Sequence, residues 1–93
     1  MTVSVYIPSP FRRLTDNREY VEAEGNNISE VLDSLEAAFP GFGDLVYDQD
    51  RQVPRHINIY VNDQEIHDLN GTDTPVTDGD QVAVIPALAG GAP

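Results

Sequence analysis

The chain contains no cysteine, no lysine and no tryptophan, and the first two absences limit what it can do. Without cysteine it forms no disulfide, offers no thiolate nucleophile and binds no metal through sulfur. Without lysine it has no side-chain amine for isopeptide linkage to itself. No apolar run approaches the about 20 residues of a membrane-spanning helix, and no signal segment follows Met1. These absences are compatible with the cytoplasm, where we expect the protein, away from any membrane.

Positive charge is also scarce. Five arginines stand against 16 acidic residues, which gives a formal net charge of −11. Nucleic-acid binding depends on cations that neutralise phosphates, so we expect no nucleic-acid partner. Such a surface attracts a protein with a basic docking face. The alternative is that the acidic charge serves solubility alone, or reflects a salty or GC-rich host.

The residue patterns that catalysis requires are missing as well. At 93 residues the chain has room for one domain and one small core, which suits a carrier or binding module better than an enzyme. The two histidines, His56 and His67, stand outside any metal-binding helical pattern, and we expect both at the surface. Asp44, Asp48 and Asp50 lack the spacing and the glycine of a calcium loop. We therefore expect no catalytic residue, no metal and no bound cofactor.

The first half of the chain predicts two strands and a helix. Residues 3–7 alternate as a strand does and end at prolines, residues 11–17 indicate a turn, and residues 18–23 indicate a hairpin partner. Asn27 followed by Glu30 indicates a helix cap. The helix is expected over residues 28–39, and its buried stripe is Ile28, Val31, Leu32, Leu35 and Phe39.

The second half predicts the rest of a sheet. Residues 44–47 could form one helical turn, and residues 48–52 indicate a loop. Residues 56–62 show the clearest strand alternation, residues 64–66 indicate a short edge strand, and residues 81–86 indicate the last strand. Two strands before the helix and two after it predict an α+β fold, a mixed sheet with one main helix across one face.

The last seven residues, 87–93, form the stretch that suggests a function for the chain. After the expected domain, residues 1–86, comes a tail, residues 87–93, in which Leu88 is the only bulky side chain. Paired glycines let a backbone pass where no Cβ fits. Extended, residues 88–91 would reach roughly 13 Å, enough to enter the active-site channel of another protein. The alternative is an inert, frayed end.

These features together resemble a known family. The carrying pattern is Val61-Asn62-Asp63, Thr74-Pro75-Val76, Asp78-Gly79-Asp80-Gln81-Val82, Ile85-Pro86-Ala87 and Ala89-Gly90-Gly91. It is similar to the MoaD/ThiS family of sulfur carriers, whose fold is the β-grasp or ubiquitin-like fold. Within that family, residues 57–63 look closest to the carrier of cysteine biosynthesis.

The resemblance implies a carrier and not an enzyme. An E1-like activating enzyme would use ATP to adenylate the carboxylate of Gly91, and a sulfur donor would convert it to a thiocarboxylate. Leu88, Ala89 and Gly90 would thread the tail into the partner. The sulfur acceptor would be an enzyme such as cysteine synthase or the large subunit of molybdopterin synthase, so the pathway could be cysteine, molybdopterin or thiazole biosynthesis.

The chain departs from the family pattern after the glycine pair. Ala92 and Pro93 follow Gly91, so the Gly91 carbonyl lies in a peptide bond and cannot be adenylated as written. Related carriers are trimmed by a zinc metallopeptidase, which makes this chain resemble a precursor cut between Gly91 and Ala92. The alternatives are an inactive carrier or non-native last residues. Two other functions stay open, a ubiquitin-like modifier conjugated through Gly91 and a non-catalytic β-grasp interaction domain.

Overall fold

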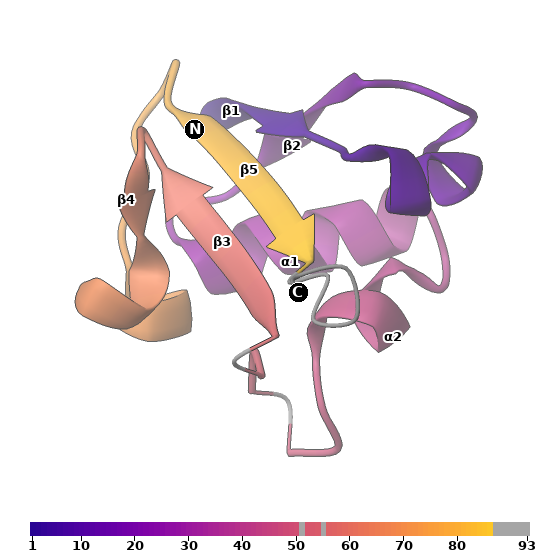
Figure 1. Cartoon of the computed structure of the whole chain (residues 1–93). Helices are drawn as coiled ribbons and strands as arrows, with labels where there is room; N and C mark the ends of the chain where they lie inside the picture. The colour runs from indigo at the N-terminus through magenta and orange to yellow at the C-terminus, as the bar shows by residue number, and fades with distance from the viewer. Residues whose placement is uncertain (51, 55, 87–93) are drawn as a thin grey trace.

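The computed structural model describes residues 1–50, 52–54 and 56–86, and its elements form one sheet with a helix behind it (Figure 1). The strands are β1 (Thr2–Tyr6), β2 (Tyr20–Glu24), β3 (Ile57–Val61), β4 (Gln64–Glu65) and β5 (Gln81–Pro86). The helices are α1 (Ile28–Ala38) and α2 (Phe42–Val46), and three 3₁₀ segments are η1 (Ser9–Thr15), η2 (Ile66–Asp68) and η3 (Gly71–Asp73). None of the helices in these described ranges is long and apolar enough to cross a membrane.

The sheet is mixed, with the strand order β2-β1-β5-β3-β4. β1 and β5 are parallel neighbours, and the other pairs are antiparallel. The first and the last strand of the described chain therefore lie side by side in the middle of the sheet (Figure 1). The predicted hairpin of the first two strands and the predicted edge position of the short strand are confirmed.

The core lies between α1 and one face of the sheet. The alternating strands send their aliphatic side chains to this inner face, as the period of two requires. The buried members from the strands are Val3, Val5, Val21, Ala23, Ile57, Ile59, Val61, Val82 and Val84. Ile28, Val31, Leu32 and Leu35 meet them from α1, and Phe39 packs partly buried against the cluster. The predicted stripe and the mixed sheet with one helix across it are confirmed.

The start of α1 has the predicted cap, with one difference in the reciprocal bond. The Asn27 side chain accepts a hydrogen bond from the Glu30 backbone N–H at 2.9 Å. The Glu30 carboxylate accepts from the N–H of Asn26 at 2.8 Å, one residue before the cap. The first bond satisfies a backbone donor that a helix start leaves without an intrahelical partner, and the second satisfies the donor of the residue before the cap.

The end of α1 is joined to α2 by a carboxylate. α1 ends at Ala38, one residue before the predicted boundary, because the residue that precedes Pro40 is disfavoured in helical conformation. Gly41 then takes φ 101° and is the N-cap residue of α2. Glu36 accepts hydrogen bonds from the N–H groups of Gly43 (2.6 Å) and Gly41 (3.0 Å). The Gly43 bond, then the Gly41 bond, lowers the pKa of Glu36.

The segment between β1 and β2 differs from the prediction. Residues 11–17 were expected as a turn, whereas η1 spans Ser9–Thr15 and buries Phe11 and Thr15. Asp16 and Asn17 follow with φ values of 56° and 63°, which end the 3₁₀ segment and delay β2 to Tyr20. The Thr15 hydroxyl donates to the backbone carbonyls of Arg12 and Arg18, so a buried polar side chain shapes this connection.

Candidate functional site

The predicted reactive residues lie outside the described part of the chain. These are Gly91 itself, the threading residues Leu88, Ala89 and Gly90, and the processing residue Ala92. The structure describes instead the base from which they follow. β5 ends at Pro86, which pairs with Ile57 of β3. Residue 87 therefore continues from the central strand of the sheet.

The start of β5 is fixed by a network around Asp80. The Asp80 carboxylate accepts hydrogen bonds from the Thr77 N–H (2.8 Å), the Thr77 hydroxyl (3.1 Å) and the Asn62 side-chain amide (2.9 Å). The Asn62 side-chain oxygen in turn accepts from the Gln81 N–H at 3.0 Å. The Thr77 N–H, followed by Asn62, lowers the pKa of Asp80. This network sets the register of β5 against the β3–β4 turn.

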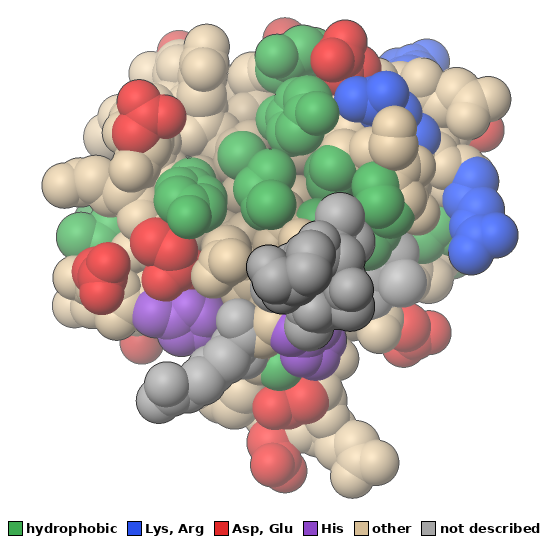
Figure 2. All heavy atoms as spheres, viewed as in Figure 1, with side chains coloured by type: hydrophobic (Ala, Val, Ile, Leu, Met, Phe, Trp, Pro, Cys, Tyr) green, Lys and Arg blue, Asp and Glu red, His purple; other side chains and the backbone are tan. Residues whose placement is uncertain are grey.

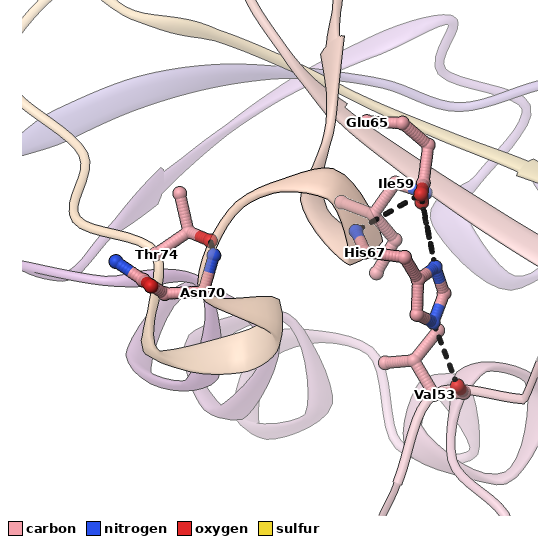
Figure 3. Close-up of polar contacts among 6 residues, drawn as sticks. All are labelled: Val53, Ile59, Glu65, His67, Asn70 and Thr74. Carbon is pink, nitrogen blue, oxygen red and sulfur yellow. Dashed lines mark hydrogen bonds and ion pairs between the residues drawn. The ribbon is translucent and has the colours of Figure 1, made fainter.

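A second polar cluster holds the loop that precedes β3 (Figure 3). The Nδ1 atom of His67 lies 2.9–3.0 Å from both carboxylate oxygens of Glu65, and its Nε2 atom lies 3.2 Å from the Val53 carbonyl oxygen. Both ring nitrogens face acceptors, an arrangement that the doubly protonated imidazolium satisfies. His67 was expected as a plain surface histidine. It is partly exposed, but it also joins η2 to the loop before β3.

One of the three loop aspartates, Asp48, has structural partners. Asp48 accepts hydrogen bonds from the backbone N–H groups of Asp50 (2.9 Å) and Gln52 (3.0 Å), so its carboxylate closes the loop that it starts. Within the described ranges, no group of three or more His, Asp or Glu side chains could hold a metal ion. The expectation that this chain binds no metal or cofactor stays a prediction.

The outer face of the sheet carries the feature that the sequence analysis did not single out. Cross-strand pairing places Tyr20 beside Tyr6, Tyr6 beside Ala83, and Ala83 beside Tyr60. These four residues form a row across β2, β1, β5 and β3 on the face away from α1. The Tyr6 and Tyr20 rings meet edge to face at 5.5 Å. Figure 2 shows the resulting cluster of apolar and tyrosine side chains over the middle of the sheet.

This outer face continues toward the end of β5. Ile85 follows Ala83 on the same side of the strand, and both are partly exposed. Tyr20 is 59% exposed and adjoins the partly exposed Tyr6. A contiguous exposed patch of this kind, unlike a single exposed side chain, is typical of an interaction site. The sequence alternation of residues 58–62 indicated which side chains share a face. The alignment of three tyrosines into one row depends on the register between strands, which the alternation does not give.

Comparisons with known proteins agree with the fold. The ThiS family model matches residues 5–91. The sulfur carrier protein CysO of Mycobacterium tuberculosis (strain H37Rv) is 37% identical over 93 residues, which cover 98% of this chain and 100% of that protein. Small archaeal modifier protein 3 of Haloferax volcanii is 42% identical over 65 residues, covering 69% of this chain and 68% of that protein.

A solved structure supports the same assignment. A chain of the crystal structure of the Amycolatopsis orientalis BexX/CysO complex superposes with a TM-score of 0.90 at 35% identity, covering 96% of this chain and 99% of that one. The predicted β-grasp fold is thereby confirmed. The family match over most of the chain and the near-complete coverage of relatives above 30% identity agree. The chain therefore belongs to the ThiS/MoaD family of ubiquitin-like sulfur carriers.

Proposed function

We propose that this chain is a precursor of a sulfur carrier for cysteine biosynthesis, and that Gly91 carries the sulfur. A peptidase removes Ala92 and Pro93, an ATP-dependent activating enzyme adenylates the Gly91 carboxylate, and a sulfur donor converts it to a thiocarboxylate. The chain itself carries the sulfur and is the substrate of these enzymes, and it is not a catalyst. We propose the cytoplasm as the place of these steps.

The observation that carries this proposal is the position of the glycine pair relative to the family match and to β5. The match to the ThiS family runs to residue 91, so Gly90 and Gly91 fall inside it and the residues after Gly91 fall outside it. Gly91 stands five residues beyond Pro86, where the central strand ends. Five extended residues span at most about 17 Å, which suffices to enter a partner's active site while the domain stays outside.

The chemistry requires both a free carboxylate and a slim stem. In the amide bond to Ala92, the Gly91 carbonyl has a poor leaving group, so hydrolysis must come first. The freed carboxylate oxygen then attacks the α-phosphate of ATP and releases pyrophosphate. The sulfur nucleophile attacks the acyl carbon and releases AMP. Gly90 and Gly91 let the acyl carbon approach a bound phosphate without a Cβ in the way.

The partners of this sequence of steps are proteins. The Amycolatopsis relative was solved in a complex with BexX, which supports docking of a partner on carriers of this kind. For this chain we propose an E1-like activating enzyme, a cysteine synthase as the sulfur acceptor, and a zinc metallopeptidase that cuts after Gly91. Molybdopterin or thiazole synthesis are the alternative destinations of the sulfur.

Intact-mass spectrometry tests the two covalent steps separately. The full chain should lose Ala92 and Pro93 when it is incubated with the metallopeptidase, and should gain no sulfur before that cut. A chain ending at Gly91 should skip the cut. With ATP, the activating enzyme and a sulfide source, it should gain the mass difference of sulfur replacing oxygen.

A matched pair of tail variants locates the reaction. In the chain ending at Gly91, Gly91→Val should block the sulfur gain, because a branched Cβ collides in a channel that fits glycine. Ala87→Val adds the same side chain next to the domain and should leave the gain in place. Failure of the Gly91-ended chain to acquire sulfur from its cognate enzymes, or acquisition by the uncut chain, would contradict the mechanism.

A second candidate function has one observation in its favour. The Haloferax volcanii relative is a small archaeal modifier protein, and it shares 42% identity over 65 residues with this chain. Conjugation through Gly91 to lysines of target proteins would use the same adenylate. It predicts high-mass conjugates on a blot of cell extract, and these should disappear when Gly91 is deleted.

A further inference from the structure

The row of tyrosines on the outer face contains a gap, and the gap is built by the choice of one small residue. Ala83 of β5 lies between Tyr6 of β1 and Tyr60 of β3, and it pairs with both. Ala83 projects only a methyl group where its two neighbours project phenol rings. We call the space above Ala83, between Tyr6 and Tyr60, the tyrosine slot. It belongs to an open depression on the outer face of the sheet.

The width of the slot suits a flat group. Neighbouring strands lie about 4.8 Å apart, so β1 and β3, with β5 between them, lie about 10 Å apart. A planar group stacked between two rings needs about 7–8 Å, at contact distances of about 3.5–4 Å on each side. A bulky residue at position 83 would fill the same space.

The slot has one apolar end and one acidic end. Toward the C-terminal end of β5 the next outward residue after Ala83 is Ile85. In the opposite direction the depression is lined by Ser4, Gln81 and Asp63. Asp63 is the only charged residue of that lining. It lies in the two-residue turn between β3 and β4, where Asn62 and Asp63 take φ values of 49° and 75°. In the described part of the chain, no hydrogen bond or ion pair engages the Asp63 carboxylate.

We propose that the tyrosine slot receives an arginine side chain of the partner that handles the tail, with Asp63 accepting hydrogen bonds from the guanidinium. This assignment rests on the proposed function, because it takes the partner to be the protein that binds the carrier. Guanidinium is flat, stacks on aromatic faces and matches a carboxylate with two parallel bonds. The net charge of −11 favours approach of a cationic group.

The chain itself shows the same pairing beside the slot. The guanidinium carbon of Arg12 lies 5.9 Å from the centre of the Tyr6 ring, and one of its nitrogens lies 3.4 Å from the Tyr6 hydroxyl and 3.5 Å from a Glu19 oxygen. A tyrosine of this face thus already contacts an arginine that is paired with a carboxylate. Arg12 does not line the depression, so it leaves the slot open.

The proposal is tested by NMR titration of the full chain with two tripeptides, acetyl-Gly-Arg-Gly-amide and its citrulline analogue. Citrulline has nearly the same shape but no charge. The arginine peptide should shift the signals of residues 6, 60, 63 and 83, and the citrulline peptide should bind at least about threefold more weakly. Ala83→Leu should abolish saturable shifts. Ala37→Leu, the same change at an exposed position of α1, should leave them unchanged.

Asp63→Asn keeps the shape of the turn residue and removes its charge. It should weaken the binding of the arginine peptide by about threefold and the binding of the citrulline peptide by less. Equal binding of the two peptides, shifts elsewhere on the surface, or full binding by Ala83→Leu would overturn the proposal.

A sulfur-loading experiment distinguishes failure of the slot from failure of the carrier mechanism. If Ala83→Leu and Ala37→Leu variants ending at Gly91 load equally fast, the slot is not used by the partner, while the sulfur-carrier function stands. If neither chain loads but the arginine peptide binds as expected, the slot recognises arginine, while the carrier mechanism and the assignment of the arginine to its partner both fail.

Discussion

The two faces of the sheet are made by the same strands but differ in chemistry. The inner face, under α1, is aliphatic throughout, and its residues are at most 9% exposed. The outer face carries tyrosines, an alanine and polar residues in one pattern, and no helix of the described chain covers it (Figure 1). Along β5, Val82 and Val84 face inward, whereas Ala83 and Ile85 face outward. The comparison teaches that alternate residues of one strand serve stability and recognition separately.

The sharpest way to break this comparison is to make the same change on both faces. Ile59 is 0% exposed on the inner face, and Ile85 is partly exposed on the outer face. Ile59→Ala should lower the free energy of unfolding by about 2–5 kcal/mol, because it removes buried methylenes and leaves a cavity. Ile85→Ala should cost less than about 1 kcal/mol. Urea unfolding measures both, and equal losses would show that the two faces do not divide the work.

The next largest effect is expected where the chain passes closest to α1. A Cβ on Gly25 would lie 2.7 Å from the Val31 backbone nitrogen and 2.8 Å from the Glu30 Cβ. Gly25→Ala should therefore destabilise the fold by about 1–3 kcal/mol through overpacking. Asn26→Ala, at the neighbouring exposed position, should stay within about 0.5 kcal/mol. A neutral Gly25→Ala in thermal unfolding would mean that α1 is free to move away from the sheet.

The smallest effect concerns the acid-dependent contribution of Asp80. Its pKa is lowered in the folded chain, first by the Thr77 N–H and then by Asn62. The carboxylate therefore contributes stability above its ordinary pKa of about 3.9, and this contribution is lost as the pH falls through the lowered folded value. Asp80→Asn should be less stable at pH 7, and the difference from the parent should shrink as the pH falls below the ordinary carboxylate range.

Asp73→Asn provides the control for this measurement. It removes the same charge at an exposed position, and it should change the unfolding free energy little at either pH. A difference between the Asp80→Asn variant and the parent that stays constant from pH 7 to pH 2 would show that packing of this side chain matters, and not its charge.

The elements that build the inner face of the sheet could be predicted from the sequence. Periodicity alone identified the strands, the buried stripe of α1 and the mixed sheet, because burial imposes a period of two on a strand and 3.6 on a helix. Asn27 marked the helix start because its side chain caps a backbone donor. The family was recognisable from the spacing between residue 61 and residue 91.

The arrangement of the outer face of the sheet and of the connecting segments could not be predicted in the same way. The row from Tyr20 to Tyr60 exists only because four strands, β2, β1, β5 and β3, pair in one register, and β5 comes from the far end of the described chain. The contact between His67 and Val53 spans 14 residues and depends on how the loop before β3 returns. The 3₁₀ segment η1 was missed because two prolines and a polar run indicate a turn, whereas the buried Phe11 and Thr15 order it. The reactive tail, residues 87–93, lies outside the described chain and stays a prediction.

The parallel pairing of β1 with β5 has a mechanical consequence. The strands run in the same direction, so a pull on the residues after Pro86 against Met1 draws the two strands past each other lengthwise. Their shared hydrogen bonds are then loaded together, in shear, and not one after another as in an unzipping hairpin. The antiparallel neighbour β3 is hydrogen-bonded to the other edge of β5. A lengthwise force applied to the tail is therefore resisted by many hydrogen bonds at once, and we expect the domain to stay folded under it.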